Sequence, residues 1–148
     1  MNKFLEYRLF VESTQFLTER RQSATQVYVT VNTLIFAVLG FLLTDTPTEG
    51  AILAVVSGAL VASGIGASIV WLRTIDGYRK LIGWRYDQLM DMERDPDFDC
   101  CGMFTREYED FFGPEGGGKP FSSMEAWLPK LFIVVYIAYF SFILLMRG

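Results

Sequence analysis

The chain has 148 residues, of which 51% are hydrophobic and 16% aromatic, and its net charge is −4 at pH 7. This length predicts a single domain, and the acidic sequence pI of about 4.8 argues against nucleic acid as a partner. The chain contains no histidine, so it lacks both the commonest general base and the commonest zinc ligand. We therefore expect no enzyme, and we expect no cofactor or metal.

The hydrophobic residues gather in three blocks, at 27–43, 51–72 and 127–146. A soluble domain of this size could bury one uncharged helix of about 20 residues but hardly three, so these blocks predict three transmembrane helices. Residues 1–26 predict a cytoplasmic amphipathic helix, and residues 73–126 predict a cytoplasmic helical region. The expected fold class is all-α, an integral membrane protein with three transmembrane helices and helical cytoplasmic extensions.

The N-terminal segment carries a broad apolar arc that includes Leu5, Leu9 and Phe16. Such an arc suits either the membrane surface or a neighbouring helix. We favour the neighbouring helix, because a helix that lies on a membrane usually has a mainly basic polar face. The polar face here also carries Glu12 and Glu19.

The first span contains one amide side chain, Asn32, one helical turn beyond Tyr28. A polar side chain at that depth is expected to find a partner on another helix, although such bonds are worth only about 1 kcal/mol. Asparagine does not carry a proton at ordinary pH. We therefore interpret Asn32 as a structural contact rather than as part of an ion or proton pathway.

The central span, residues 51–72, is free of charge, and its small residues recur at helical spacing. In lipid, helices associate where small residues let two backbones approach closely. We predict that this helix is surrounded by other helices and that its small residues form a helix-packing interface. One line of this interface consists of Ala54, Gly58, Ala62 and Gly66, and the adjoining line consists of Ala59, Ser63 and Ala67.

Beyond the central span, the helical pattern continues at heptad spacing and predicts a helix that projects into the cytoplasm until Pro96 ends it. The residues that define this pattern are Ile75, Tyr78, Ile82, Leu89 and Met92. The charged residues between them predict a solvated face, with Arg79, Lys80 and Arg85 set against Asp87 and Asp91.

Two segments resemble ligand-binding loops but lack residues on which binding depends. Residues 95–101 carry three alternating aspartates, yet they lack the Gly and the Glu that an EF-hand loop requires. Residues 113–119 match the start of a phosphate-binding loop, but Pro120 stands where Ser or Thr would hold magnesium. We expect a solvated turn and a flexible loop, and two reduced thiols at Cys100 and Cys101.

The C-terminal third of the chain predicts two more helices. Residues 103–112 have the pattern of a short amphipathic helix, and residues 122–125 have the spacing of a capping box that opens the last helix. In the last span, Phe132, Tyr136 and Phe140 share one face. We interpret these aromatic side chains as bulk that packs against the small-residue helix.

The distribution of Lys and Arg predicts the topology. The N-terminal segment has four of them, the 44–50 loop has none, residues 73–130 have eight, and the tail has one. Because Lys and Arg are enriched in cytoplasmic segments, we expect a cytoplasmic N-terminus and a C-terminus on the periplasmic or extracellular side.

Six short segments with a distinctive order are found at residues 7–10, 13–14, 18–22, 31–33, 104–109 and 124–132. In this order they resemble a family of small bacterial inner-membrane proteins, the RipA-type octameric membrane proteins. The resemblance implies a homo-octamer in the bacterial cytoplasmic membrane, without a known enzyme activity. The architecture is also similar to small membrane effector domains of bacterial defence systems, but those usually have two spans.

Two functions therefore remain open. The first is a structural or scaffold protein, in which a ring of identical subunits organises partners or membrane through its cytoplasmic helices. The second is a channel or membrane-perturbing effector, although the apolar stretches 27–43, 51–72 and 131–146 carry no charge that could line a water path. The main polar candidates for such a path are Asn32, Thr30, Thr33, Ser57, Ser63 and Ser68.

Overall fold

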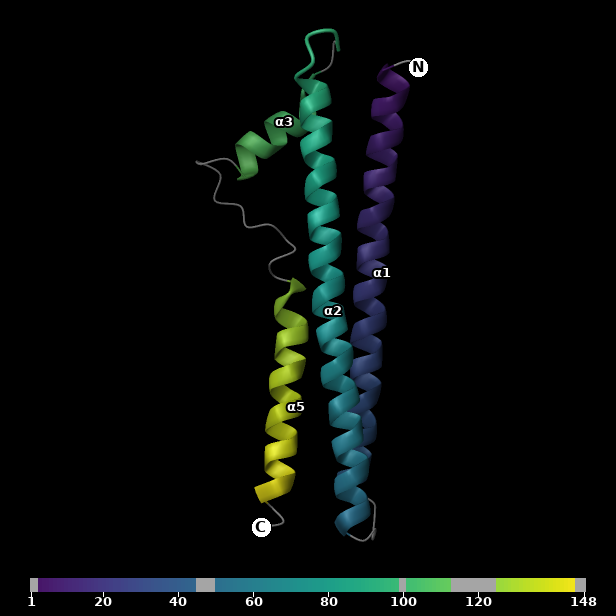
Figure 1. Ribbon diagram of the computed structural model, residues 1–148, viewed down its shortest axis with the longest axis vertical. Helices are drawn as coiled ribbons and strands as arrows, with labels where there is room; N and C mark the ends of the chain where they lie inside the picture. Colours follow the sequence, from purple (N-terminus) through teal and green to yellow (C-terminus); the bar gives the residue numbers. More distant parts are fainter. Residues whose placement is uncertain (1–2, 45–49, 99–100, 113–124, 146–148) are drawn as a thin grey trace. The chain divides into compact units, whose positions relative to one another are not determined.

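The computed structural model describes residues 3–44, 50–98, 101–112 and 125–145. Its elements, in order, are α1 (Lys3–Thr44), α2 (Gly50–Glu93), α3 (Met103–Glu107), the π-helical turn η1 (Tyr108–Phe112) and α5 (Trp127–Leu145), as drawn in Figure 1. None of these described residues lies in a strand. Within them, α1, α2 and α5 are each long and apolar enough to cross a membrane, so the expected fold class is confirmed.

The two long helices continue well past their apolar parts. The predicted N-terminal helix and the first span form the single helix α1, which contains no proline and has its only glycine at position 40. Helix α2 runs from the central span to Glu93, three residues before Pro96. A proline disfavours helical backbone at the residue before it and cannot donate a backbone hydrogen bond, so it ends the helix as expected.

The chain divides into two compact units. The span unit consists of Ser23–Thr74 and Glu125–Gly148, and the charged unit consists of Met1–Gln22 and Ile75–Met124. Each long helix contributes one part to each unit, because the boundary falls within α1 and within α2.

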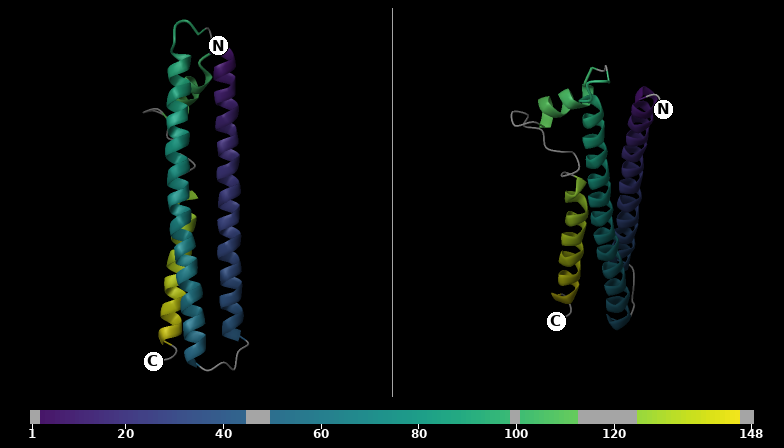
Figure 2. Two further views of the ribbon diagram at one scale, coloured as in Figure 1. Left: turned by 45° about the vertical axis from the view of Figure 1, so that its right-hand side comes forward. Right: turned by 45° about the horizontal axis from the view of Figure 1, so that its top comes forward.

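The span unit has a small apolar core where three helices meet. Leu39 of α1, Val61 of α2 and Tyr136 of α5 are buried in it. In this unit α5 runs alongside the first half of α2 in each view of Figures 1 and 2. Most other side chains of the spans are exposed in the single chain, as expected of helices that contact lipid or further helices.

In the charged unit, the predicted heptad face of α2 turns inward. Ile75 and Leu89 are buried, and Tyr78, Ile82 and Met92 are half-buried. The apolar arc of α1 meets our expectation only in part. Its residues Leu5, Leu9 and Phe16 are 49%, 55% and 53% exposed, whereas Phe10 beside them is half-buried and its ring centre lies 6.3 Å from that of Trp84 on α2.

The prediction that Arg85 belongs to a solvated face is wrong. Its position continues the heptad of α2, and the side chain is half-buried. One guanidinium nitrogen donates a hydrogen bond to the Ser13 hydroxyl, and the guanidinium lies 5.5 Å from the centre of the Phe10 ring. The long apolar stem of arginine lets it occupy such a position. Lys80 remains exposed, and its ion pair is with Asp76 at 2.7 Å.

Candidate functional site

The side chain of Asn32 joins all three helices of the span unit. Asn32 is fully buried on α1, and its Oδ1 accepts a hydrogen bond from the Ser68 hydroxyl of α2 at 3.2 Å. The same oxygen accepts a second bond from the Tyr136 hydroxyl of α5 at 3.0 Å. Its Nδ2 donates to the carbonyl of Tyr28 at 2.8 Å. The expected interhelical partner of Asn32 is therefore present on both of the other helices.

The ring of Tyr136 lies directly on the backbone of α2 at Gly64. A Cβ atom added at Gly64 would overlap the Tyr136 ring, so only glycine fits there without movement. Gly64 precedes Ser68 by one helical turn, which places both residues on the same face as the Tyr136 hydroxyl. Our sequence analysis did not include Gly64 among the packing residues. The i, i+4 pair of Gly64 and Ser68 was the signal that could have revealed it.

Aromatic rings fill the rest of this junction. Phe36 stacks on Tyr136 with centroids 4.3 Å apart, and Phe132 lies between Phe36 and Trp71 at 5.7 and 6.1 Å. A Cβ at Gly58 would meet the Phe140 ring at 3.7 Å. The prediction that the aromatic face of the last span packs against the small-residue helix is therefore confirmed.

The seven small residues predicted to form a packing interface divide into two sets. Ala54, Gly58 and Ala67 are half-buried within the span unit, whereas Ala59, Ala62, Ser63 and Gly66 are exposed. The inward face of α2 is instead formed by Ser57, Val61, Gly64, Ser68 and Trp71, which are all buried. The predicted small residues of α2 therefore lie on two sides of the helix. Those on one side are half-buried within the span unit, and those on the other side form a small-residue surface that is exposed in the single chain.

In the charged unit, the Glu93 carboxylate connects three helices. Its Oε1 accepts hydrogen bonds from the Tyr7 hydroxyl at 2.7 Å and from the Phe104 amide at 3.1 Å. Its Oε2 accepts bonds from both the amide and the hydroxyl of Thr105 at 2.8 Å. The residue that precedes α3 is Gly102, at φ +59°, and it has no side chain to cap the helix. Glu93 therefore supplies the cap from α2.

These contacts also shift the acidity of Glu93. Burial alone would raise the pKa of the Glu93 carboxyl. The hydrogen bonds from Thr105, Tyr7 and Phe104 outweigh that effect, so the pKa lies below its ordinary value. Tyr7 and the segment at 104–109 are two of the pieces that carry the family resemblance, and in the structure they meet at this carboxylate.

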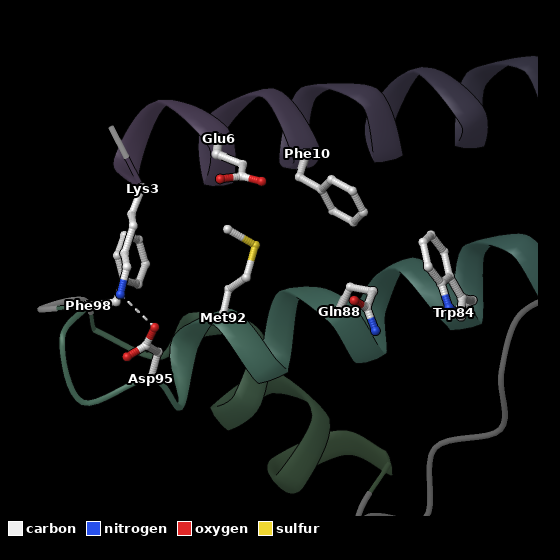
Figure 3. A pocket seen from close by; sticks show the side chains of 8 residues that line it. All are labelled: Lys3, Glu6, Phe10, Trp84, Gln88, Met92, Asp95 and Phe98. Atoms are coloured by element: carbon white, nitrogen blue, oxygen red, sulfur yellow. Dashed lines mark hydrogen bonds and ion pairs between the residues drawn. The ribbon is translucent and has the colours of Figure 1, made fainter. Parts of the chain in front are cut away.

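The ends of α1 and α2 in the charged unit flank an open cleft of about 340 Å³ (Figure 3). Its lining mixes apolar, acidic and basic side chains, namely Lys3, Glu6, Phe10, Trp84, Gln88, Met92, Asp95 and Phe98. Lys3 and Asp95 form an ion pair of 2.8 Å across it. Their hydrogen bond raises the pKa of Lys3 and lowers that of Asp95. Both side chains of this pair are partly exposed, at 52% and 39% of their surface.

Other expected features fall partly outside the described residues. The segments at 113–119 and 122–124 and Cys100 lie outside the described residues, whereas Cys101 is a free, exposed cysteine. Asp95 accepts a hydrogen bond from the Asp97 amide at 3.0 Å, which is a local turn contact. Within the described ranges, no three His, Cys, Asp or Glu side chains gather in a way that could hold a metal ion.

The apolar helices and the polar junction buried among them define a polytopic α-helical membrane protein. The sequence pattern of the octameric membrane protein family (8xMP) matches residues 4–145. The chain therefore belongs to this family, which confirms the resemblance to octameric membrane proteins. No curated protein and no solved structure matches the chain.

We predict that Gly64→Ala destabilises the span unit, because the new methyl group would collide with the Tyr136 ring. Overpacking of this kind typically costs about 1–3 kcal/mol. The measurement is thermal unfolding of the purified protein in detergent, followed by circular dichroism. The control is Gly77→Ala on the same helix, where a Cβ meets nothing within 4 Å. Equal losses from the two substitutions would contradict the close approach at Gly64.

We predict that Glu93→Gln loosens α3, since an amide cannot accept all four hydrogen bonds as a carboxylate does. Hydrogen bonds to charged groups contribute about 1.5–3 kcal/mol each, so protection of the Phe104 and Thr105 amides from hydrogen exchange should fall at least tenfold. The control is Glu109→Gln, on an exposed side chain of η1.

The same protection should depend on pH. The pKa of Glu93 is lower in the fold than its ordinary value of 4.5, so its stabilising contribution is present above pH 4.5. It is lost as the pH falls through the folded-state pKa. In Glu93→Gln this loss of protection should be absent. If the variant still loses protection over the same pH range, the loss arises from a titrating group other than Glu93.

Proposed function

We propose that this protein is a homo-oligomeric scaffold of the bacterial inner membrane, in which the charged units of several copies form a cytoplasmic helical layer. The observation that carries this proposal is the exposed small-residue surface on α2, formed by Ala59, Ala62, Ser63 and Gly66. Such residues favour close helix approach rather than contact with lipid. Membership of an octameric family supports a partner that is another copy of the same chain.

Exposed apolar side chains in the charged unit also support assembly. On α1 these are Phe4, Leu5, Leu9 and Phe16, and on α2 they include Trp84, which is 55% exposed. In water, burying such surface between copies gains roughly 25 cal/mol per Å². The charged unit would therefore add a hydrophobic contribution that the spans lack within the bilayer. The assembled layer would present its charged faces to other proteins or to lipid headgroups.

A channel or membrane-perturbing effector is the second candidate, and one observation favours it. Thr30 and Thr33 on the first span are exposed in the single chain, so a ring could place them around a lumen. Their hydroxyls, however, donate to the carbonyls of Gln26 and Val29 within α1 and do not need water. An image of the purified oligomer along its axis separates the two functions. A lipid-free lumen would favour the channel, and a closed or lipid-filled centre would favour the scaffold.

We predict that Ala62→Leu dissociates or weakens the oligomer, because the added bulk would block close approach of a second helix. The expected cost is about 1–3 kcal/mol per contact. The measurement is the mass of the detergent-solubilised particle by light scattering, corrected for detergent. The control is Val55→Leu, a side chain that is 72% exposed and stands at the end of the small-residue surface, where a bulky side chain is already present. If the two variants lose mass equally, α2 has no dedicated interface at Ala62.

We predict that the two ends of the chain lie on opposite sides of the membrane, with the N-terminus in the cytoplasm. The reason is the excess of Lys and Arg in residues 1–26 and 73–130. A periplasmic reporter enzyme fused after Gly148 should be active, whereas the same enzyme inserted at Glu115 should be inactive. Activity at both positions, or at neither, would contradict three spans.

A further inference from the structure

The exposed side of α1 in the span unit consists of two parallel lines of different character. One line is bulky and apolar and contains Val27, Val31, Leu34, Val38 and Phe41. The adjacent line is polar or small and contains Gln26, Thr30, Thr33, Ala37 and Gly40. All of these residues are exposed in the single chain. Bulky side chains suit lipid, whereas a line of small residues suits the close approach of another helix.

The exposed side of α2 has a matching feature in its middle. Ala59, Ala62, Ser63 and Gly66 form a small-residue surface, and larger exposed residues stand at both of its ends. These larger residues are Val55 and Val56 on one side and Ile69 and Val70 on the other. The α2 surface is therefore a row of small side chains with bulkier side chains at both ends.

The hydroxyl groups on both surfaces are already satisfied within their own helices. Thr30 and Thr33 donate to backbone carbonyls of α1 at 2.9 and 2.8 Å, and Ser63 donates to the Ala59 carbonyl at 2.8 Å. Apart from Gln26 at the end of the α1 line, neither surface therefore needs water or a polar ligand. Each can be buried against a helix at no cost in lost hydrogen bonds.

The symmetry of a membrane oligomer decides how these surfaces can meet. Copies inserted in the same orientation are related by rotation about the membrane normal, and a closed ring of this kind needs a head-to-tail contact between two different faces. Such a rotation keeps every residue at its depth in the membrane. Two faces can therefore pair only if their small residues lie at equal depth within one protomer.

The structure meets this condition. Helices α1 and α2 run in opposite directions, and the bond between Asn32 and Ser68 sets their relative level in the span unit (Figure 1). Moving along both helices from that bond, Ala37 reaches the level of Ala62 and Ser63. By the same count Gly40 reaches the level of Leu60, one residue from Ala59.

We infer that the polar and small line of α1 in one copy packs into the small-residue surface of α2 in the next copy. In this contact Ala37 lies opposite Ala62, and Gly40 lies opposite Ala59. The contact repeats around the ring, and the bulky line of α1 faces lipid. The inference rests on the proposed homo-oligomer and adds which two faces meet.

The test is disulfide cross-linking between copies that carry different tags. In a background with Cys100→Ser and Cys101→Ser, one tagged copy carries Ala37→Cys and the other carries Ala62→Cys, and both are expressed in the same cells. A disulfide requires Cβ atoms about 3.5–4.5 Å apart, so it reports a close contact. We expect oxidation of the membranes to give a band of twice the 16.9 kDa protomer mass that contains both tags.

Controls at the same depth make the result specific. Val38→Cys in place of Ala37→Cys should give no mixed dimer, because it lies on the bulky line. Each cysteine variant expressed alone should also give no dimer. Dimers from Ala62→Cys alone would indicate a symmetric contact and overturn the inference, as would equal cross-linking from Val38→Cys.

Two further measurements separate failure of the inference from failure of the proposed function. Light scattering of each variant first establishes whether the oligomer is retained, and a protomer mass for the unsubstituted chain would overturn the oligomer itself. A retained oligomer without mixed dimers would overturn only the pairing of faces. Reaction of Ala37→Cys with a charged, membrane-impermeant thiol reagent would instead place this line in a water-filled lumen and also overturn the pairing.

Discussion

The buried amide of Asn32 is the constraint on which the arrangement of the three apolar helices depends. Each of its bonds is worth only about 1 kcal/mol in a membrane, but an unsatisfied polar group there would cost more than its bond contributes. The hydroxyls of Ser68 and Tyr136 must therefore reach the same oxygen. Tyr136 can do so only because Gly64 leaves room for its ring. The levels of α1, α2 and α5 within the span unit follow from this junction.

The charged unit follows different physics because charged side chains are interspersed along its helices. Burial of the heptad face of α2, including Ile75 and Leu89, supplies the hydrophobic contribution. Glu93 then positions α3 by receiving hydrogen bonds from two other elements. A carboxylate is suited to this role because it accepts several bonds at once, and these bonds hold its pKa below the ordinary value in spite of burial.

Assembly follows from what these two sets of contacts leave exposed. The Asn32 junction uses one face of α2, so the small residues around Ala62 remain on the opposite face. Likewise, Tyr7 and Phe10 are half-buried in the charged unit, which leaves Leu5, Leu9 and Phe16 of the same helix exposed. A chain with so much small or apolar surface outside its own core is suited to an oligomer, which is the state that its family describes.

The sequence by itself determined the helices, because long uncharged blocks, heptad spacing and Pro96 act through local rules of hydrophobicity and backbone geometry. It also predicted that Asn32 would need a partner. Only the tertiary structure decided which partner, because the choice depends on how three helices are rotated about their axes. The same rotations put Gly64 inward and Ala62 outward. The sequence alone does not separate them, because both are small residues suited to close helix packing. Arg85 was misplaced for the same reason, since its charge suggested solvent while its position in the heptad placed it against Phe10.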